Sequence, residues 1–174
     1  MALAVCLLFD ARTEHAVRET WRRLEDTGVP TLLSHTHGRH VPHLSYAVLR
    51  TFDVAAVMDA TDLLPDEGPM NLHFDALGMF RRSRSWLVPA VTSDIAARQE
   101  RVVEAVESTG ADLHQHYRPG VWVPHCTIAP RIKLEQLPRL AAAVYDVLPL
   151  VGTVERAALI DSGTGEQWPL RHIP

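Results

Sequence analysis

The sequence has little cysteine and no long apolar run. Its 174 residues include two cysteines, Cys6 and Cys126, which are too few for a disulfide scaffold. No stretch approaches the roughly 20 apolar residues that a membrane helix needs. The apolar segment 2–9 lacks a basic flank and a small-residue cleavage site, and it is short for a signal peptide. We therefore expect a cytoplasmic protein that has no membrane partner.

An excess of positive charge is also missing. The formal net charge is −4, from 17 basic and 21 acidic residues. Proteins that coat long nucleic acids usually have strongly basic surfaces, so this balance excludes that class and favours a short or small ligand. A local basic cluster remains at Arg81, Arg82 and Arg84. Such a cluster can meet a phosphate chain or form a solvated turn.

What the sequence does contain is a short pattern, Val-Pro-His-x-Ser/Thr, that occurs twice. Side chains on a strand alternate between its faces, so His43 and Ser45 should share one face, and so should His125 and Thr127. Cys126 should then point away from that face, into the core. Two such copies, facing each other, can hold a phosphate between two proton-transfer groups.

The contexts of the two copies match as well. The pattern His-x-His-x-Arg precedes each copy, at residues 35–39 and 114–118. An apolar-periodic stretch that predicts a helix follows each copy, from about Asp53 and from about Leu134. Two copies in matching contexts indicate a pseudo-duplicated chain with one site at its centre.

The predicted elements come in a mixed order. Expected strands cover residues 3–9, 41–49, 70–80, 86–91, 122–129, 151–160 and 167–173, and expected helices begin near residues 10, 53, 93 and 134. This order favours the α+β class with antiparallel sheets over a doubly wound parallel fold. The length predicts a single domain, 1–174, made of two pseudo-symmetric lobes, about 1–80 and 81–174, whose terminal strands can be exchanged between the lobes.

The two motifs resemble the paired His-x-Ser/Thr-x motifs of the two-histidine (2H) phosphoesterases. Residues 122–127, Trp-Val-Pro-His-Cys-Thr, fit the second motif of the bacterial 2′-5′ RNA ligase-like branch. Residues 43–46 fit the first motif, although Ser45 replaces the common threonine and Tyr46 an aliphatic residue. The resemblance implies a bilobed fold in which two antiparallel sheets surround a central cleft and helices lie outside. It implies no cofactor and no metal.

The resemblance also implies a reaction, the hydrolysis of a 2′,3′-cyclic phosphate on an RNA 3′ end or on a small cyclic nucleotide. Imidazole has an unperturbed pKa near 6.5, so one ring can accept a proton while the other donates one. The same pair of histidines can also catalyse the reverse reaction, which is 2′-5′ RNA ligation. The family usually leaves the phosphate on the 2′ oxygen with the second-motif histidine as base, which makes His125 the hypothetical base.

The predicted catalytic residues are therefore His43 and His125, and the predicted phosphate-binding hydroxyls are those of Ser45 and Thr127. Three further residues can line the substrate, namely Trp122, Tyr46 and Arg131. Arg131 stands one position later than the basic residue that is common in this branch. Loops at 63–69 and 109–120 are expected to set specificity, and a monomer is favoured.

Two alternative functions stay open. Seven of the ten histidines fall in two groups, namely His35, His37, His40 and His43, and His114, His116 and His125. Histidine is a good zinc or nickel ligand, so a metal-binding protein is one alternative. The other is a non-catalytic protein that binds nucleotides or RNA ends.

Overall fold

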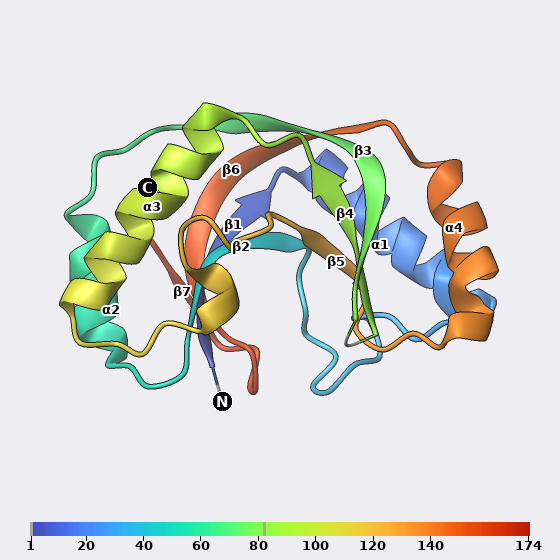
Figure 1. Ribbon diagram of the computed structural model, residues 1–174, viewed down its shortest axis with the longest axis horizontal. Helices are drawn as coiled ribbons and strands as arrows, with labels where there is room; N and C mark the ends of the chain where they lie inside the picture. Colours follow the sequence, from blue (N-terminus) through green and yellow to red (C-terminus); the bar gives the residue numbers. More distant parts are fainter. Residues whose placement is uncertain (1, 82) are drawn as a thin grey trace.

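The computed structural model describes residues 2–81 and 83–174 (Figure 1). Its strands are β1 (Leu3–Phe9), β2 (His43–Leu49), β3 (Met70–Phe80), β4 (Arg84–Pro89), β5 (Cys126–Ala129), β6 (Leu150–Asp161) and β7 (Gln167–Pro169). Its helices are α1 (Ala11–Asp26), α2 (Val54–Asp62), α3 (Ser93–Ser108) and α4 (Leu137–Tyr145), with two short 3-10 helices, η1 (Gln115–Tyr117) and η2 (Leu134–Gln136). Arg82, part of the predicted basic cluster, lies outside the described residues.

The strands pair antiparallel throughout, which confirms the predicted α+β class. Their order is β2-β1-β6-β3-β4-β5, and β7 pairs with β6 beside this path. The separate sheets that the resemblance implied are joined into one. The physical reason is the length of β6, because its residues 154–161 pair with β1 while residues 150–154 pair with β3. One long strand therefore belongs to both halves of the sheet.

The helices form two pairs at opposite ends of the sheet. Helix α3 packs against α2 and β2, and α1 packs against α4 and β5 (Figure 1). Asp10 and Asp53 cap α1 and α2, as predicted, since their carboxylates accept the backbone N–H groups of Thr13 and Ala56. Helix α3 begins at Ser93, as predicted, with Thr92 as its cap. No described helix is long and apolar enough to cross a membrane.

The two faces of the sheet differ. The face that meets the helices carries the main hydrophobic core, which includes Trp21 and Tyr46. The opposite face of β1 and β6 carries a small cluster, Ala4, Cys6, Leu8, Ala158 and Ile160, against which Val41 and Val48 pack. The described members of this small cluster come from strands and the segment leading into β2, so no helix contributes to it.

Both motif strands begin later than predicted. Strand β2 begins at His43, directly after Pro42, and β5 begins at Cys126, directly after Pro124 and His125. Proline has no N–H to give to a strand partner. Before β5, the N–H groups of Val121 and Trp122 donate to the carbonyl of Arg118, which makes a turn where a strand was expected.

The motif strands also lie at the two ends of the strand order, so each has a strand partner on one side only. Two tryptophans bond to their outer backbone. The indole Nε1 of Trp122 donates to the carbonyl of Ser45 at 3.0 Å, and that of Trp21 donates to the carbonyl of Thr127 at 3.2 Å. Strands β2 and β5 also contact each other. The curved sheet therefore brings its two ends, and both motifs, together.

Candidate active site

The first motif places its imidazole and its hydroxyl on the face away from the helices. In the register of β1 and β2, His43 lies opposite Leu8 and Ser45 lies opposite Cys6. Both β1 residues belong to the small cluster on that face. Tyr46, one position further along, points into the main core. The alternation expected from the sequence therefore holds from His43 to Tyr46, and a bulge at Tyr46 then puts Ala47 into the same core.

Both motif histidines make the same local hydrogen bond. Nδ1 of His43 bonds to the carbonyl of Val41 at 2.7 Å, and Nδ1 of His125 bonds to the carbonyl of Val123 at 2.7 Å. A carbonyl can only accept, so Nδ1 carries the hydrogen in each ring. The intervening proline has a fixed φ, which limits how the acceptor carbonyl can move. Each neutral ring therefore keeps the lone pair of Nε2 for proton transfer.

The environment holds both rings neutral at pH 7. Burial lowers the pKa of His43, against the opposing effect of its bond to Val41. Burial also lowers the pKa of His125, to about 4, and the positive charges of His43 and Arg84 lower it further against its bond to Val123. Because a charge on His43 affects His125, the two rings share one electrostatic environment.

An aromatic wall accounts for much of the burial of His125. The ring of Phe80 stacks on Trp86 with centroids 3.7 Å apart, and it makes a T-shaped contact with the His125 ring, with centroids 5.3 Å apart. Trp86 itself lies 5.7 Å from His125. Gly78 lies opposite Trp86 in the register, and a Cβ there would lie 2.5 Å from the indole. Glycine therefore leaves the space that the wall needs. The sequence analysis missed Phe80 and Trp86 because cross-strand register is not readable from one strand.

A second residue that the sequence analysis missed is Tyr117, in η1. Its hydroxyl hydrogen-bonds to the side chain of Ser45, and burial raises its pKa to about 12. Its ring centroid lies 6.4 Å from that of His125. The side chain of Gln99, in α3, fixes this segment against β2, because its Nε2 donates to the carbonyls of Tyr117 at 2.7 Å and Tyr46 at 3.2 Å. Tyr117 falls in the loop 109–120 that was expected to set specificity.

The three residues expected to line the substrate have different surroundings. Tyr46 is fully buried, so it packs in the core instead of lining a site. Trp122 packs partly against the core, with its ring 5.9 Å from Tyr46, and its indole joins the second motif to the Ser45 carbonyl. Arg131 is exposed, and its charge lowers the pKa of His35. Thr127 lies opposite Trp86, beside the aromatic wall.

The predicted basic cluster contributes Arg84 to the site. Arg84 is the first residue of β4, and its positive charge acts on His125, His35 and Tyr117. Arg81 is exposed on the turn before it. Arg84 differs from a cation on a solvated turn because it lies close to the second motif. The sequence alone could not predict this proximity.

The histidine-rich segments do not assemble into a metal site. In the loop before β2, the ring of His40 lies 4.1 Å from that of His37 and 5.8 Å from that of His35. Burial, with the nearby histidines, lowers the pKa of His40 to about 4. Within residues 2–81 and 83–174, no group of three or more His, Cys, Asp or Glu side chains is arranged to hold a metal ion. The metal-binding alternative therefore has no ligand set in the described chain.

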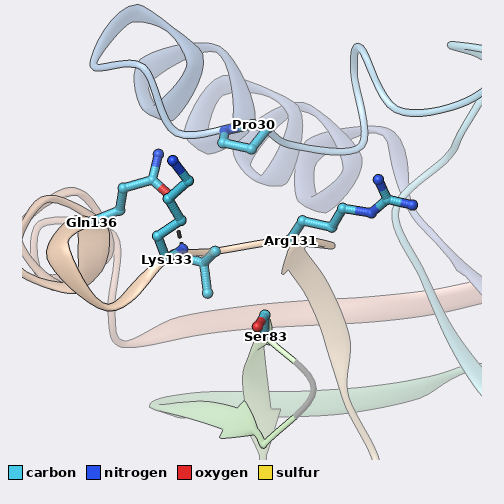
Figure 2. Close-up of a pocket in the computed structure, with 6 residues that line it drawn as sticks. Pro30, Ser83, Arg131, Lys133 and Gln136 are labelled. Atoms are coloured by element: carbon cyan, nitrogen blue, oxygen red, sulfur yellow. Dashed lines mark hydrogen bonds between the residues drawn. The ribbon is translucent and has the colours of Figure 1, made fainter.

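A cavity of about 460 Å³ adjoins Arg131. Figure 2 shows its lining, which consists of Pro30, Ser83, Arg131, Ile132, Lys133 and Gln136. The guanidinium group of Arg131 points away from Lys133 and Gln136 in this view. Neither motif histidine lines the cavity.

Comparison with known proteins assigns the chain to a family. The model of the 2′-5′ RNA ligase superfamily matches residues 13–166, a range that includes both motifs. The chain therefore belongs to this superfamily, as the two motifs predicted, and membership favours phosphoesterase or RNA ligase-like chemistry. No curated protein matches the chain by sequence.

Solved structures share the fold at low identity. A phosphoesterase has a TM-score of 0.63 and 15% identity, over 97% of this chain and 94% of that one. LigT of E. coli, solved with NADP+, has a TM-score of 0.61 and 15% identity, with the same coverage of 97% and 94%. Usb1 of Kluyveromyces marxianus, solved with uridine monophosphate, has a TM-score of 0.53 and 12% identity, over 97% of each chain.

The neutral burial of His125 should make the stability of the protein depend on pH. Its pKa is about 4 in the folded protein and near 6.5 in the unfolded chain, so between these values the unfolded chain binds more protons. We expect the free energy of unfolding to fall as the pH is lowered from about 6.5 to about 4. His125→Asn should reduce this slope without abolishing it, since His40 shifts in the same direction.

Urea unfolding at a series of pH values measures that slope. His15→Asn, on the exposed side of α1, is the matched control. A slope that is the same in wild type and His125→Asn would contradict the assignment.

Proposed function

We propose that this member of the 2′-5′ RNA ligase superfamily is a metal-independent phosphodiesterase that hydrolyses a 2′,3′-cyclic phosphate on an RNA end or a small nucleotide. The observation that carries the proposal is the matched pair of imidazoles. Each ring donates from Nδ1 to the carbonyl two residues before it, and neither Nε2 has a hydrogen-bond partner among the described residues. Each ring has a hydroxyl residue two positions later on its strand segment.

The reaction needs one base and one acid. A water oxygen attacks phosphorus while Nε2 of His125 takes the water proton. The bond from phosphorus to the ribose 3′ oxygen breaks, and that oxygen receives a proton from Nε2 of His43. The product is a 2′-phosphate. Ser45 and Thr127 donate hydrogen bonds to the non-bridging oxygens, and these bonds strengthen as negative charge builds in the transition state.

The local electrostatics favour His125 as the base. Its pKa of about 4 keeps the ring unprotonated at pH 7, as a base must be. The acid must hold a proton in the complex. Burial lowers the pKa of His43 in the free protein, and a phosphate anion bound between the rings raises it, so His43 can hold the proton that the acid must donate.

Nucleotide ligands suit this site. The related folds include LigT solved with NADP+ and with ATP, and Usb1 solved with uridine monophosphate. By microscopic reversibility the same pair also serves ligation. A 5′-hydroxyl then takes the place of water, His125 accepts its proton, and a 2′-5′ linkage forms as the 3′ oxygen leaves. Ligation is therefore the second activity that this site supports.

Activity in EDTA should depend on both histidines. Nucleoside 2′,3′-cyclic phosphates are the substrates, and His43→Ala and His125→Ala should each lower kcat/KM by about 10²- to 10⁴-fold. The pH profile assigns the roles. His125→Ala should lose the rise in rate at acid pH, and His43→Ala should lose the fall in rate at higher pH. His15→Ala is the control.

Loss of the same limb of the profile in both variants would contradict the role assignment. Abolition of wild-type turnover by EDTA would contradict metal independence.

Tyr117 should support the reaction through Ser45. When the Tyr117 hydroxyl donates to Ser45 Oγ, it limits the rotation of the Ser45 side chain and leaves the Ser45 proton for the phosphate. We expect Tyr117→Phe to lower kcat about tenfold with little change in KM. In the Ser45→Ala background, the same substitution should have almost no further effect.

Steady-state kinetics on the four proteins of this double-mutant cycle measures the coupling. Tyr145→Phe, which alters an exposed tyrosine, is the control. Independent, additive effects of the two substitutions would show that Tyr117 does not act through Ser45.

A further inference from the structure

Two segments that each carry an arginine lie side by side at the end of the sheet that carries the second motif. Arg84 follows Ser83 at the start of β4, and Arg131 precedes Ile132 after the end of β5. The N–H of Ile132 donates to the carbonyl of Ser83 at 2.8 Å. This backbone bond holds the two arginine-bearing segments side by side.

The register gives Arg84 the same face as the aromatic wall. Along β4, Ser85 and Leu87 are fully buried, whereas Arg84 is exposed and Trp86 stacks with Phe80. In the pairing of β3 with β4, Arg84 lies opposite Phe80, whose ring makes the T-shaped contact with the His125 ring. Arg84 therefore lies next to the wall that contacts the base.

The charges of these two arginines are not neutralised. Over residues 2–81 and 83–174, neither Arg84 nor Arg131 takes part in an ion pair or a side-chain hydrogen bond. Several arginines elsewhere do: Arg98, Arg101 and Arg171 each pair with a carboxylate. Besides burial, the charges of Arg131 and Arg84 lower the pKa of His35, so both cations act on the same group near the first motif.

The scissile phosphate does not require these cations. Under the proposed function it lies between two histidines and two hydroxyls, and none of these four residues is Arg84 or Arg131. Guanidinium groups bind phosphate well because their planar donors match its oxygens. Arg131 also borders the 460 Å³ cavity, and its guanidinium group extends away from Lys133 and Gln136 on the other side of that cavity (Figure 2).

We propose that Arg84 and Arg131 form a second anion subsite, which binds a phosphate on the 5′ side of the nucleotide whose cyclic phosphate is hydrolysed. In a nucleoside 2′,3′-cyclic phosphate, the 2′ and 3′ oxygens are both bonded to the cyclic phosphate. The 5′ oxygen is therefore the ribose position that can carry another phosphate. The substrate class is therefore a nucleotide with two separate phosphate groups. The second group is either a phosphodiester of a short RNA or the 5′-phosphate of a small nucleotide. This inference rests on the proposed function.

A pair of substrates that differ in one group tests the subsite. The probes are adenosine 2′,3′-cyclic phosphate with a 5′-hydroxyl and the same compound with a 5′-phosphate. In wild type, the 5′-phosphate should raise kcat/KM at least about tenfold. Arg84→Gln and Arg131→Gln should each reduce this ratio, and the double variant should bring it close to one. Effects on proton transfer cancel in the ratio, because the same histidines cleave both substrates.

Arg12→Gln, which removes an exposed arginine from α1, is the matched control and should leave the ratio unchanged. A third probe, a dinucleotide with a 3′-terminal 2′,3′-cyclic phosphate, separates the two sources of the second phosphate. A gain confined to the dinucleotide assigns the subsite to RNA, and a gain for the 5′-phosphate assigns it to small nucleotides.

Two results would overturn the subsite while leaving the proposed function intact. One is equal kcat/KM for all three probes in wild type, and the other is a wild-type gain that survives in the double variant. If wild type cleaves none of the probes, the proposed function and the subsite fall together.

Discussion

The site depends on the unpaired edges of two strands. Strands β2 and β5 end the strand order of a single sheet, so the outer backbone of each must find partners other than a strand. The indoles of Trp122 and Trp21 donate to the carbonyls of Ser45 and Thr127, which are the hydroxyl residues of the two motifs. The bonds that satisfy the edges therefore also fix the backbone from which the phosphate-binding side chains extend.

Protonation follows from this architecture. Proline before each histidine places a carbonyl within reach of Nδ1, so the same tautomer occurs in both copies. The stacked rings of Phe80 and Trp86 then exclude water from one side of His125. The imidazole of His125 is therefore neutral and can accept a proton. Because the unfolded chain binds that proton more readily, the free energy of unfolding falls in acid. The same burial thus serves catalysis at neutral pH and limits stability at low pH.

Local patterns in the sequence predicted what depends on local geometry. Alternation placed His43 with Ser45 and put Cys126 in the core, and the helix caps at Asp10 and Asp53 are where they were expected. The same alternation, applied consistently, would have removed Tyr46 from the site, because it is one position from Ser45. Its aromatic character suggested stacking on a base, whereas its position on the strand decides its burial.

Features that depend on pairing between distant segments were not readable from the sequence. The contact of Phe80 with His125 requires the register of β3, β4 and β5, and the bond of Tyr117 to Ser45 requires a 3-10 turn held by Gln99. The joining of the expected two sheets depends on which residues of β6 pair with each neighbour. Long-range register of this kind is set by packing of the whole chain rather than by the propensity of any one segment.

In the proposed reaction, two imidazoles with the same tautomer act on one phosphate. A long-range 1H–15N correlation spectrum of the histidine side chains tests this directly, with His43→Ala and His125→Ala used to assign the signals. At pH 7 we predict that His43 and His125 are both neutral with hydrogen on Nδ1. Addition of adenosine 2′-phosphate, the proposed product, should shift the Nε2 signals of both rings and leave that of His15 in place. A response from only one of the two rings, or hydrogen on Nε2 of either ring in the free protein, would contradict the account.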